Sequence, residues 1–250
     1  MSAATAGIAP PLHLSHSEGT TDFCRFAGGR KEFDMIDFDA RARQWDADPV
    51  KVERARTIAE AIAARVPLSP HMTALEYGCG TGVVSFALQP LLGRITLADS
   101  SPGMLQVLGE KLAAGDIRNM EPRALDLVAD PLPQERFDLV YSAMTLHHIP
   151  DTDLILSRFH ALLKPSGFLC IADLDREDGS FHDPEFEGHH GFDRDELAAR
   201  ATRAGFGEIA FATVFEVIKE AKGEQRSFPV FLMTARRREV GSAGGPLGGE

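Results

Sequence analysis

The stretch that decides the fold is Ala74-Leu-Glu-Tyr-Gly-Cys-Gly-Thr-Gly-Val-Val-Ser-Phe-Ala-Leu88. It begins as a short apolar strand, continues as a glycine-rich turn and ends in an amphipathic segment that starts near Val83. Glycine permits a tight turn and lets the backbone approach a ligand closely, because it has no Cβ. A strand that leads through such a loop into a helix is typical of open α/β sheets that bind nucleotide-like ligands.

The spacing of the glycines limits the choice of ligand. Gly78, Gly80 and Gly82 alternate with other residues, and the acidic Glu76 precedes them. A dinucleotide fingerprint requires its third glycine where Val83 stands, and a P-loop requires a Gly-Lys-Ser/Thr ending that this loop lacks. The remaining pattern resembles motif I of the class I S-adenosylmethionine (SAM) dependent methyltransferases. A glycine triplet alone is equally compatible with a plain tight turn, so other motifs must support the resemblance.

Length and composition fit one α/β domain with additions, or at most two small domains. The 250 residues are 44% hydrophobic and 25% charged, which is ordinary for a globular protein with a sizeable core. A net charge of -11 argues against nucleic acid or an anionic membrane surface as partner. The sequence shows neither a signal-peptide pattern nor an apolar run long enough for a membrane span. Its scattered cysteines favour a reducing compartment, so we expect a cytoplasmic protein.

Strand and helix patterns alternate along the middle of the chain. The strand-like runs are 73–77, 94–99, 122–127, 137–141 and 167–172, and helical patterns separate them. This alternation predicts βαβ units and a parallel sheet whose two faces are covered by helices. A helix that starts at Asp193 precedes two β-rich runs, 208–219 and 227–234, which predict a terminal hairpin.

The regions on either side of this core predict a division into four parts. Residues 1–30 lack periodicity and predict a flexible N-terminal segment. Residues 31–70 predict a helical appendage, residues 71–238 the main domain, and residues 239–250 a disordered tail. Methyltransferases of the resembled kind often fold such helices over the cofactor as a lid. Trp45 is then expected in the substrate pocket, although core packing explains it equally well.

Two acids follow predicted strands where the resembled family binds SAM. Asp99 ends the second strand, and the resemblance implies that it binds both ribose hydroxyls; the alternative is a helix cap or an exposed acid. Asp126 follows the third strand, and the resemblance implies contacts from it and from the Leu127 N–H to the adenine. The full expected cofactor set is Glu76, Gly78, Cys79, Gly80, Gly82, Asp99, Ser100, Met104, Asp126, Leu127 and Ser142.

A histidine pair follows the fourth strand, in Phe137-Asp-Leu-Val-Tyr-Ser-Ala-Met-Thr-Leu-His-His-Ile-Pro-Asp151. This stretch resembles the corresponding segment of the ubiquinone-biosynthesis-like branch of the methyltransferases. Lys164-Pro-Ser-Gly-Phe168 resembles the turn of that branch into the fifth strand, with Ser166 in place of a glycine. His147 or His148 could act as a general base, because imidazole titrates near neutrality. Alternatively, one histidine packs under the helix and the other bonds backbone near the methionine moiety.

Three more histidines lie after the fifth strand, in a segment expected to cover the crevice. His182, His189 and His190 are interspersed with acids, but they lack the paired helical spacing of metal ligands. We therefore expect a lid that shapes the substrate pocket and no metal. A surface loop with incidental histidines is the remaining interpretation.

The resemblance covers residues 73–173 and implies a Rossmann-like, doubly wound, mainly parallel seven-stranded sheet with an antiparallel last strand, which agrees with the predicted terminal hairpin. The resemblance implies SAM as cofactor and methyl transfer to a small-molecule acceptor. The loop after the fourth strand lacks the Asn/Asp-Pro-Pro-Tyr/Phe pattern of base-modifying enzymes, which also disfavours nucleic acid. A non-catalytic SAM or S-adenosylhomocysteine binding protein and an NAD(P)-dependent oxidoreductase are the alternatives. The sequence leaves the acceptor atom and the oligomeric state open.

Overall fold

The computed structural model describes residues 37–238. The flexible segment expected at 1–30 and the disordered tail expected at 239–250 lie outside the described residues, as does the beginning of the expected helical appendage.

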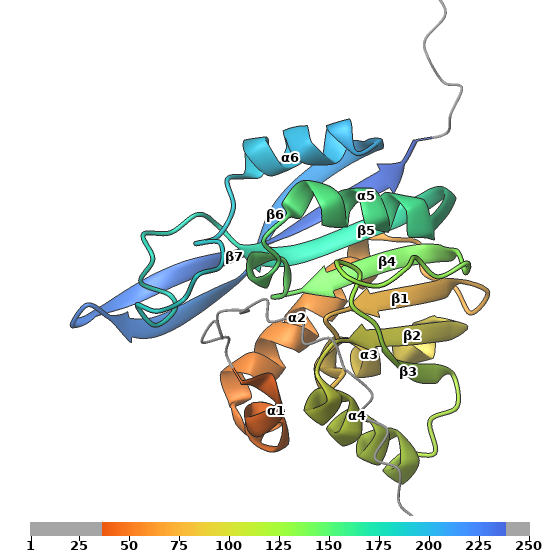
Figure 1. The fold of residues 1–250 in the computed structure, drawn as a ribbon, viewed down its shortest axis with the longest axis horizontal. Helices are drawn as coiled ribbons and strands as arrows, with labels where there is room; N and C mark the ends of the chain where they lie inside the picture. Colours follow the sequence, from red (N-terminus) through yellow and green to blue (C-terminus); the bar gives the residue numbers. More distant parts are fainter. Residues whose placement is uncertain (1–36, 239–250) are drawn as a thin grey trace, which may run out of the picture. The chain divides into compact units, whose positions relative to one another are not determined.

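The centre of the fold is a seven-stranded sheet with the strand order β3-β2-β1-β4-β5-β7-β6 (Figure 1). Strands β1 to β5 pair in parallel, whereas β7 runs antiparallel to both β5 and β6. This arrangement confirms the predicted Rossmann-like sheet with an antiparallel last strand. The strands are β1 (Thr73–Tyr77), β2 (Arg94–Asp99), β3 (Met120–Ala124), β4 (Phe137–Ala143), β5 (Leu163–Leu174), β6 (Phe206–Ala221) and β7 (Glu224–Arg237).

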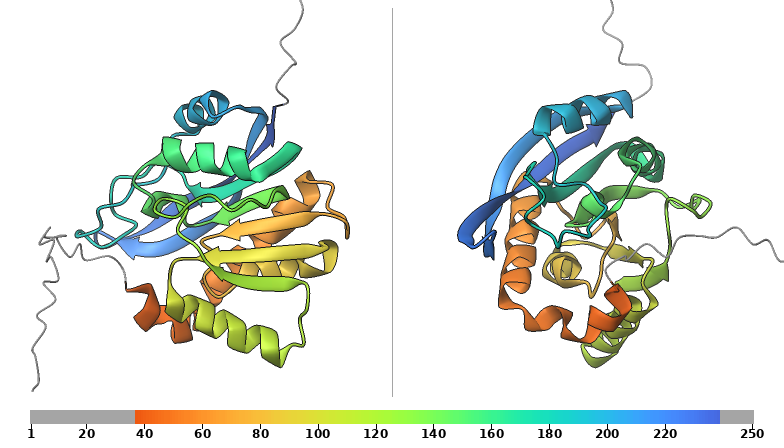
Figure 2. Two further views of the ribbon diagram at one scale, coloured as in Figure 1. Left: turned by 45° about the vertical axis from the view of Figure 1, so that its right-hand side comes forward. Right: turned by 60° about the vertical axis from the view of Figure 1, so that its left-hand side comes forward.

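Helices cover both faces of the sheet (Figure 2). One apolar cluster joins Ile58 of α2 and Leu108 of α4 to one face, and a second joins Phe159 of α5 and Leu197 of α6 to the other. The helical elements are α1 (Phe38–Arg41), η1 (Ala42–Ala47), α2 (Pro49–Arg65), α3 (Val83–Leu88), η2 (Gln89–Leu91), α4 (Pro102–Ala114), η3 (Leu146–His148), α5 (Thr152–Leu162) and α6 (Arg194–Arg203).

Side-chain caps fix where the longer helices begin. The Ser101 hydroxyl accepts the N–H of Met104, and Pro102 occupies the first turn of α4. The Asp193 carboxylate accepts the N–H groups of Asp195 and Glu196 at the start of α6. Such caps satisfy backbone donors that have no partner inside the helix, and proline tolerates the first turn because it lacks the N–H.

Several element boundaries differ from the sequence prediction, and two of these differences follow from turns. β3 ends at Ala124 and not at 127, because the chain turns at Asp126, whose carbonyl accepts the N–H of Asp130. The terminal hairpin closes at Lys222 and Gly223, whose φ angles of 53° and 79° are those of a tight two-residue turn. The polar stretch 220–226, expected to link the strands, is therefore mostly strand.

The parallel strands place their carboxyl ends along one edge of the sheet. β1, β2 and β4 end at Tyr77, Asp99 and Ala143, and the glycine loop, the first turn of α4 and η3 follow them. Loops that leave neighbouring parallel strands meet at this edge, which is where open α/β sheets bind ligands. Within residues 37–238, no helix combines the length and apolar character needed to cross a membrane.

Candidate functional site

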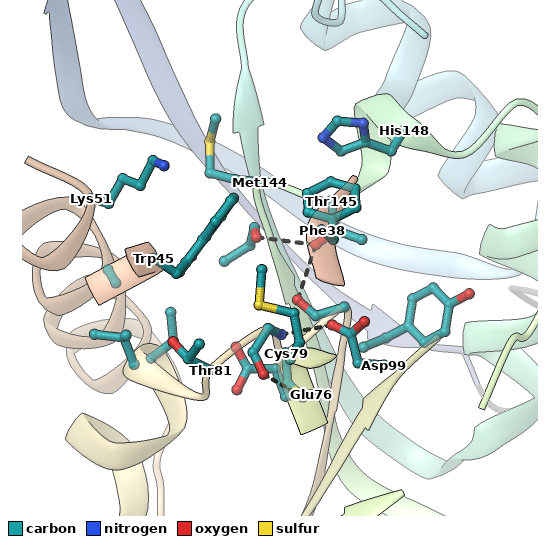
Figure 3. Close-up of a pocket in the computed structure, with 18 of the residues that line it drawn as sticks. Phe38, Trp45, Lys51, Glu76, Cys79, Thr81, Asp99, Met144, Thr145 and His148 are labelled. Carbon is teal, nitrogen blue, oxygen red and sulfur yellow. Dashed lines mark hydrogen bonds between the residues drawn. The ribbon is translucent and has the colours of Figure 1, made fainter. Parts of the chain in front are cut away.

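A cavity of about 370 Å³ lies at this edge of the sheet. Figure 3 shows Glu76, Cys79 and Asp99 along one side, Lys51 and Trp45 on another, and Thr145 and His148 opposite them. The wall therefore combines the glycine loop, the end of β2, the loop after β4 and the N-terminal helices α1, η1 and α2.

The glycine loop approaches the cavity with its bare backbone. A Cβ at Gly80 would meet only Met104 Sδ at 3.9 Å and Trp45 Nε1 at 4.0 Å, so the space beside this residue is open. A Cβ at Gly78 would lie 2.2 Å from Thr145 Cγ2, and the φ of Gly78 is +69°. Gly78 thus allows the loop after β4 to pack against the turn, and Gly80 leaves room for a ligand.

Asp99 ties the glycine loop to the start of α4. Its carboxylate accepts the N–H of Gly80 at 2.7 Å and the N–H of Ser101 at 2.9 Å. Burial raises the pKa of this carboxyl, and the backbone N–H groups oppose that rise. Asp99 and its neighbour Ser100 both line the cavity.

Glu76 is buried beneath the loop. Its carboxyl accepts the hydroxyl of Ser85, which in turn hydrogen-bonds the Tyr141 hydroxyl. Burial raises the pKa of Glu76 to about 8, although the hydrogen bond from Ser85 opposes the rise. Burial likewise raises the pKa of the Cys79 thiol well above its ordinary value, so Cys79 presents a neutral thiol to the cavity.

The loop after β3 contributes Asp126 to the wall, and Met104 of α4 lines the same cavity. The Asp126 carboxylate accepts the N–H of Val128 at 2.8 Å. Leu127 is fully buried, and its N–H donates to the Tyr77 hydroxyl at 3.1 Å. The resemblance implied that the Leu127 N–H binds an adenine nitrogen. In the structure this N–H is already hydrogen-bonded to the Tyr77 side chain.

Three further expected cofactor or catalytic residues lie behind the wall. Gly82 begins α3, where a Cβ would lie 2.7 Å from Leu108 Cδ1. Ser142 is buried and donates its hydroxyl to the Tyr77 carbonyl at 2.9 Å, which joins β4 to β1. His147 is turned into the core, with only 2% of its surface exposed.

The two neighbouring histidines therefore differ in position. His147 Nδ1 is 2.7 Å from Asp173 Oδ1, and Asp173 also accepts the N–H groups of His147 and Leu174. Burial alone would raise the pKa of Asp173, but its pairing with His147 and these N–H bonds hold the pKa below the ordinary value. His148 lines the cavity.

The pKa of His148 differs from the near-neutral value expected of an unperturbed imidazole. Burial, reinforced by the adjacent His147 and His182, lowers it to about 3. His148 is therefore neutral at physiological pH. It can accept a hydrogen bond there, but it is a weak base.

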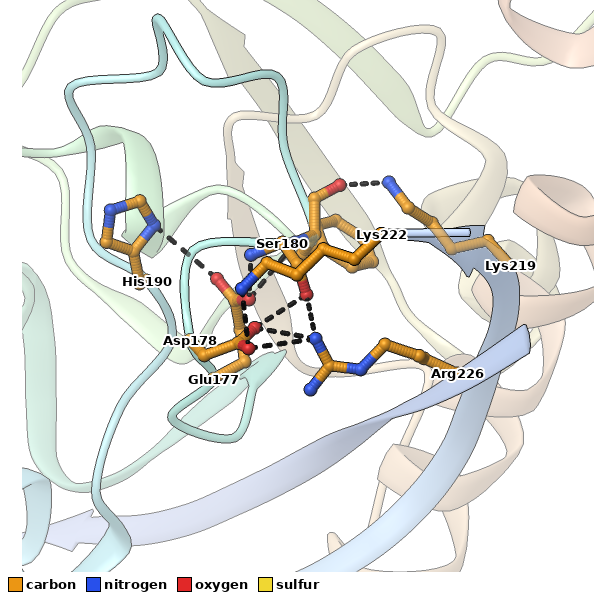
Figure 4. A network of polar contacts seen from close by, with 8 residues as sticks. Glu177, Asp178, Ser180, His190, Lys219, Lys222 and Arg226 are labelled. Atoms are coloured by element: carbon orange, nitrogen blue, oxygen red, sulfur yellow. Dashed lines mark hydrogen bonds and ion pairs between the residues drawn. The ribbon is translucent and has the colours of Figure 1, made fainter. Parts of the chain in front are cut away.

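The segment after β5 places its histidines beyond the cavity wall. The ring of His182 stacks on Phe186, and its centroid lies 5.7 Å from that of His148. His189 Nε2 is 3.0 Å from the Ile149 carbonyl, and His190 pairs with Glu177 at 3.4 Å. Figure 4 shows this last pair beside Asp178, which Lys222 and Arg226 of the hairpin hold in place. Residues 37–238 contain no cluster of histidine, cysteine or acidic side chains arranged to hold a metal ion.

The N-terminal helices form a roof, by which we mean residues 38–58 where they line the cavity. Trp45 lies there, and Lys51 Nζ sits 3.9 Å from the centroid of its ring. Asp46 fastens the roof, because its carboxylate accepts the Thr81 hydroxyl at 2.5 Å and Lys111 Nζ at 2.7 Å.

Sequence reasoning missed several wall residues. Lys51 lies four positions before Ala55, and Arg54 lies four positions before Ile58, so they extend the same helical stripe toward the site. This spacing could have predicted both residues at the site, because cations that continue the apolar face of a helix lie at the edge of the buried surface. Met144, by contrast, lines the cavity with a φ of 55°, an uncommon angle for a residue other than glycine that carries no sequence pattern. The other missed residues include Phe38, Thr81 and Thr145.

Comparison with known proteins agrees with the fold. Residues 74–167 match the family model described as "Methyltransferase domain". An uncharacterized methyltransferase of Schizosaccharomyces pombe is 34% identical over 118 residues, which are 44% of this chain and 42% of that protein. The ubiquinone biosynthesis O-methyltransferase of Xanthomonas euvesicatoria is 30% identical over 150 residues, 56% of this chain and 59% of that protein. The chain thus spans about half the length of the curated relatives it matches.

Among solved structures, the phosphoethanolamine N-methyltransferase 2 of Haemonchus contortus in complex with SAM has a similar fold. Its TM-score is 0.62 at 15% identity, over 82% of this chain and 61% of that one. The family model identifies residues 74–167 as a methyltransferase domain, and the sheet order and this likeness show that its fold is that of the class I SAM-dependent methyltransferases. Within that class, the chain is similar to the ubiquinone biosynthesis O-methyltransferases over the stretch given above.

Proposed function

We propose that the protein transfers the methyl group of SAM to a small-molecule acceptor, whose reacting atom (oxygen, nitrogen, sulfur or carbon) stays open. The observation that carries this proposal is the carboxylate of Asp99, which faces the cavity beside the open space at Gly80. A carboxylate there can accept the hydrogen bonds of a ribose. The bare backbone at Gly80 leaves room for the chain that joins the ribose to the methionyl group.

The other wall residues would hold separate parts of the cofactor. Asp126 and Met104 lie toward the loop after β3 and would hold the adenine end. Glu76 and Cys79 lie at the glycine loop and would face the methionyl end, and Ser100 would support the ribose. Gly82, Leu127, Ser142 and His147 would support this wall from behind through the contacts described above.

SAM would supply a methyl group on a sulfonium, which is already activated for transfer. The main task of the protein is then to align the acceptor and to exclude water. Neutral His148 would accept a hydrogen bond from an O–H or N–H of the acceptor and so turn its lone pair toward the methyl. Phe38 and Trp45 would shield the reacting groups from solvent.

The surrounding segments complete the proposal. The described part of the N-terminal appendage, residues 37–70, would act as the lid of the main domain. His182, His189 and His190 would belong to a flap beside the acceptor end, given the proximity of His182 to His148. The net charge of -11 supports a small molecule over nucleic acid, and the buried free thiols Cys79 and Cys170 support a cytoplasmic location.

Calorimetric titration with SAM, S-adenosylhomocysteine, NAD⁺ and NADP⁺ tests the cofactor. We expect the first two to bind and the nicotinamides not to bind, because Val83 occupies the place of the third glycine of a dinucleotide fingerprint. Binding of a nicotinamide without binding of SAM would overturn the proposal in favour of the oxidoreductase.

Methyl transfer is then measured with methyl-tritiated SAM and a panel of phenols, amines, thiols and carboxylic acids. We expect label in the small-molecule fraction for at least one acceptor class. SAM binding without transfer to any class would favour the alternative of a non-catalytic binding protein.

A further inference from the structure

Two cationic side chains of α2 reach the cavity from its roof. Lys51 and Arg54 share one face of the helix with Ala55 and Ile58, and all four line the cavity. The first two residues bring positive charge to a wall that otherwise carries acids. Each cation is therefore expected to pair with an anion.

Lys51 belongs to the side of the glycine loop. Its ammonium lies over the Trp45 ring, and Trp45 Nε1 lies 4.0 Å from the position that a Cβ at Gly80 would take. In the proposed function, the methionyl end of the cofactor lies along this loop. Lys51 is thus placed to meet the carboxylate that the donor carries.

Arg54 lies one helical turn after Lys51, about 4.5 Å further along the helix axis. The acids whose charges act on it are Asp173 and Asp48. Ile58, one turn further along α2, shares an apolar cluster with Leu174, the last residue of β5. The residue before it, Asp173, is the buried partner of His147, so Arg54 lies on the histidine side of the site.

The guanidinium of Arg54 has no hydrogen-bond or ion-pair partner within residues 37–238. Asp173 is unavailable, because its oxygens already accept the His147 ring and two backbone N–H groups. Burial lowers the pKa of Arg54, which means that its charge is poorly solvated. A partly buried cation without a partner is unfavourable unless a ligand supplies the anion.

We propose that Arg54 is an anion subsite on the acceptor side of the cavity and that the methyl acceptor is a small molecule bearing a carboxylate. The inference rests on the proposed function, since it takes the second ligand to be a methyl acceptor. The planar guanidinium offers the paired donors that a carboxylate accepts. The imidazoles of His148 and His182 on this side are neutral, so one positive charge matches one negative charge.

The test compares Arg54→Met, Arg54→Lys and Lys51→Met with Arg56→Met. Arg56 is exposed on the same helix and serves as the matched control. The probes are S-adenosylhomocysteine, 5′-methylthioadenosine, which lacks the methionyl carboxylate, and three acid–amide pairs. These pairs are 4-hydroxybenzoate with 4-hydroxybenzamide, indole-3-acetate with indole-3-acetamide, and hexanoate with hexanamide, titrated into the S-adenosylhomocysteine complex by calorimetry.

We expect the wild-type complex to bind the acid of at least one pair more tightly than its amide. Arg54→Met should weaken that acid by about 10- to 100-fold and leave the amide unchanged, because only the charged hydrogen bonds are lost. Arg54→Lys should restore part of the preference, and Arg56→Met should behave as wild type. Arg54→Met should melt no lower than wild type, since it removes an unpaired charge.

Two results would overturn the inference. One is a wild-type complex that prefers the acid of no pair. The other is a loss of S-adenosylhomocysteine affinity in Arg54→Met without loss of 5′-methylthioadenosine affinity, which would assign Arg54 to the methionyl carboxylate. We expect that pattern for Lys51→Met. Failure of wild type to bind S-adenosylhomocysteine would instead refute the proposed function itself.

Discussion

Asp99 organises its surroundings without any ligand. The carboxylate accepts the N–H groups of Gly80 and Ser101, so it fixes both the glycine loop and the first turn of α4. The same oxygens retain lone pairs that can accept further hydrogen bonds, because each carboxylate offers about four acceptor positions. One side chain can therefore shape the site and also bind the proposed ribose.

Substitution of Asp99 separates these two contributions. Asp99→Ala should weaken S-adenosylhomocysteine binding by about 1–3 kcal/mol, through loss of charge-assisted hydrogen bonds. Asp99→Asn should lose less, because the amide oxygen still accepts one of the N–H groups. Calorimetry measures both, with the exposed Asp183→Ala as control. Unchanged affinity in Asp99→Ala would count against Asp99 as the ribose ligand.

Some of the site residues could be predicted from the sequence, and others could not. Asp99 and Asp126 could be placed at the cavity beforehand, because both follow strands whose ends meet at one edge. His147 and His148 could not be told apart, since the short η3 turn decides which ring faces the core. The unpaired charge of Arg54 could not be predicted, because only the folded structure shows that its guanidinium has no partner. No sequence motif marks this property.

At the scale of elements, α1 and η1 close the cavity through a small number of polar contacts. Asp46 bridges to Thr81 in the glycine loop and to Lys111 in α4, and Asp39 accepts the Gly103 N–H at 2.8 Å. The pair formed by Lys111 and Asp46 is about one-third exposed, so its contribution is modest and sensitive to salt.

Loosening this contact should speed ligand release. Asp46→Ala should raise the dissociation rate of S-adenosylhomocysteine by about two- to fivefold, in line with the 0.2–1 kcal/mol of a partly exposed pair. Trp45 is the only tryptophan of the chain and lines the cavity, so stopped-flow fluorescence reports on the roof directly. Arg43→Ala, which breaks the exposed pair with Glu110 on the same roof, is the control. Equal rates in all three proteins would contradict a fastening role for Asp46.

The elements themselves were largely predictable. Hydrophobic alternation and the caps at Ser101 and Asp193 gave the order of strands and helices. The length of the terminal strands was underestimated, because charged residues between 220 and 226 resemble a loop yet pair across a two-residue turn. Strand ends of this kind extend beyond the hydrophobic core. Their residues are polar, so the hydrophobic pattern of the sequence does not predict that they form strands.

At the scale of the whole molecule, Glu76 couples stability to pH. It stands on β1, an interior strand of the sheet, and burial raises its pKa to about 8 from an ordinary value of 4.5. Between these values the folded protein keeps a proton that the unfolded chain has released. The free energy of unfolding therefore falls as pH rises through this window, by at most about 1.4 kcal/mol per pH unit.

Glu76→Gln should remove this contribution, because the amide cannot ionise while its oxygen still accepts the Ser85 hydroxyl. Urea unfolding of wild type and variant is compared from about pH 5.5 to 8.5. We expect the variant to gain stability relative to wild type as pH rises. Two parallel curves would show that Glu76 titrates normally.

The packing of α2 has a consequence for protein synthesis. Ile58 and Ile62 share an apolar cluster with Val217 of β6 and with Phe228 and Val230 of β7. The ribosome thus makes the roof helix early and the strands that cover its apolar side last. A nascent chain stalled after β5 would already expose the glycine loop and Asp99, yet its roof helix would lack these partners. Such an intermediate is a natural client for chaperones that bind exposed apolar helices.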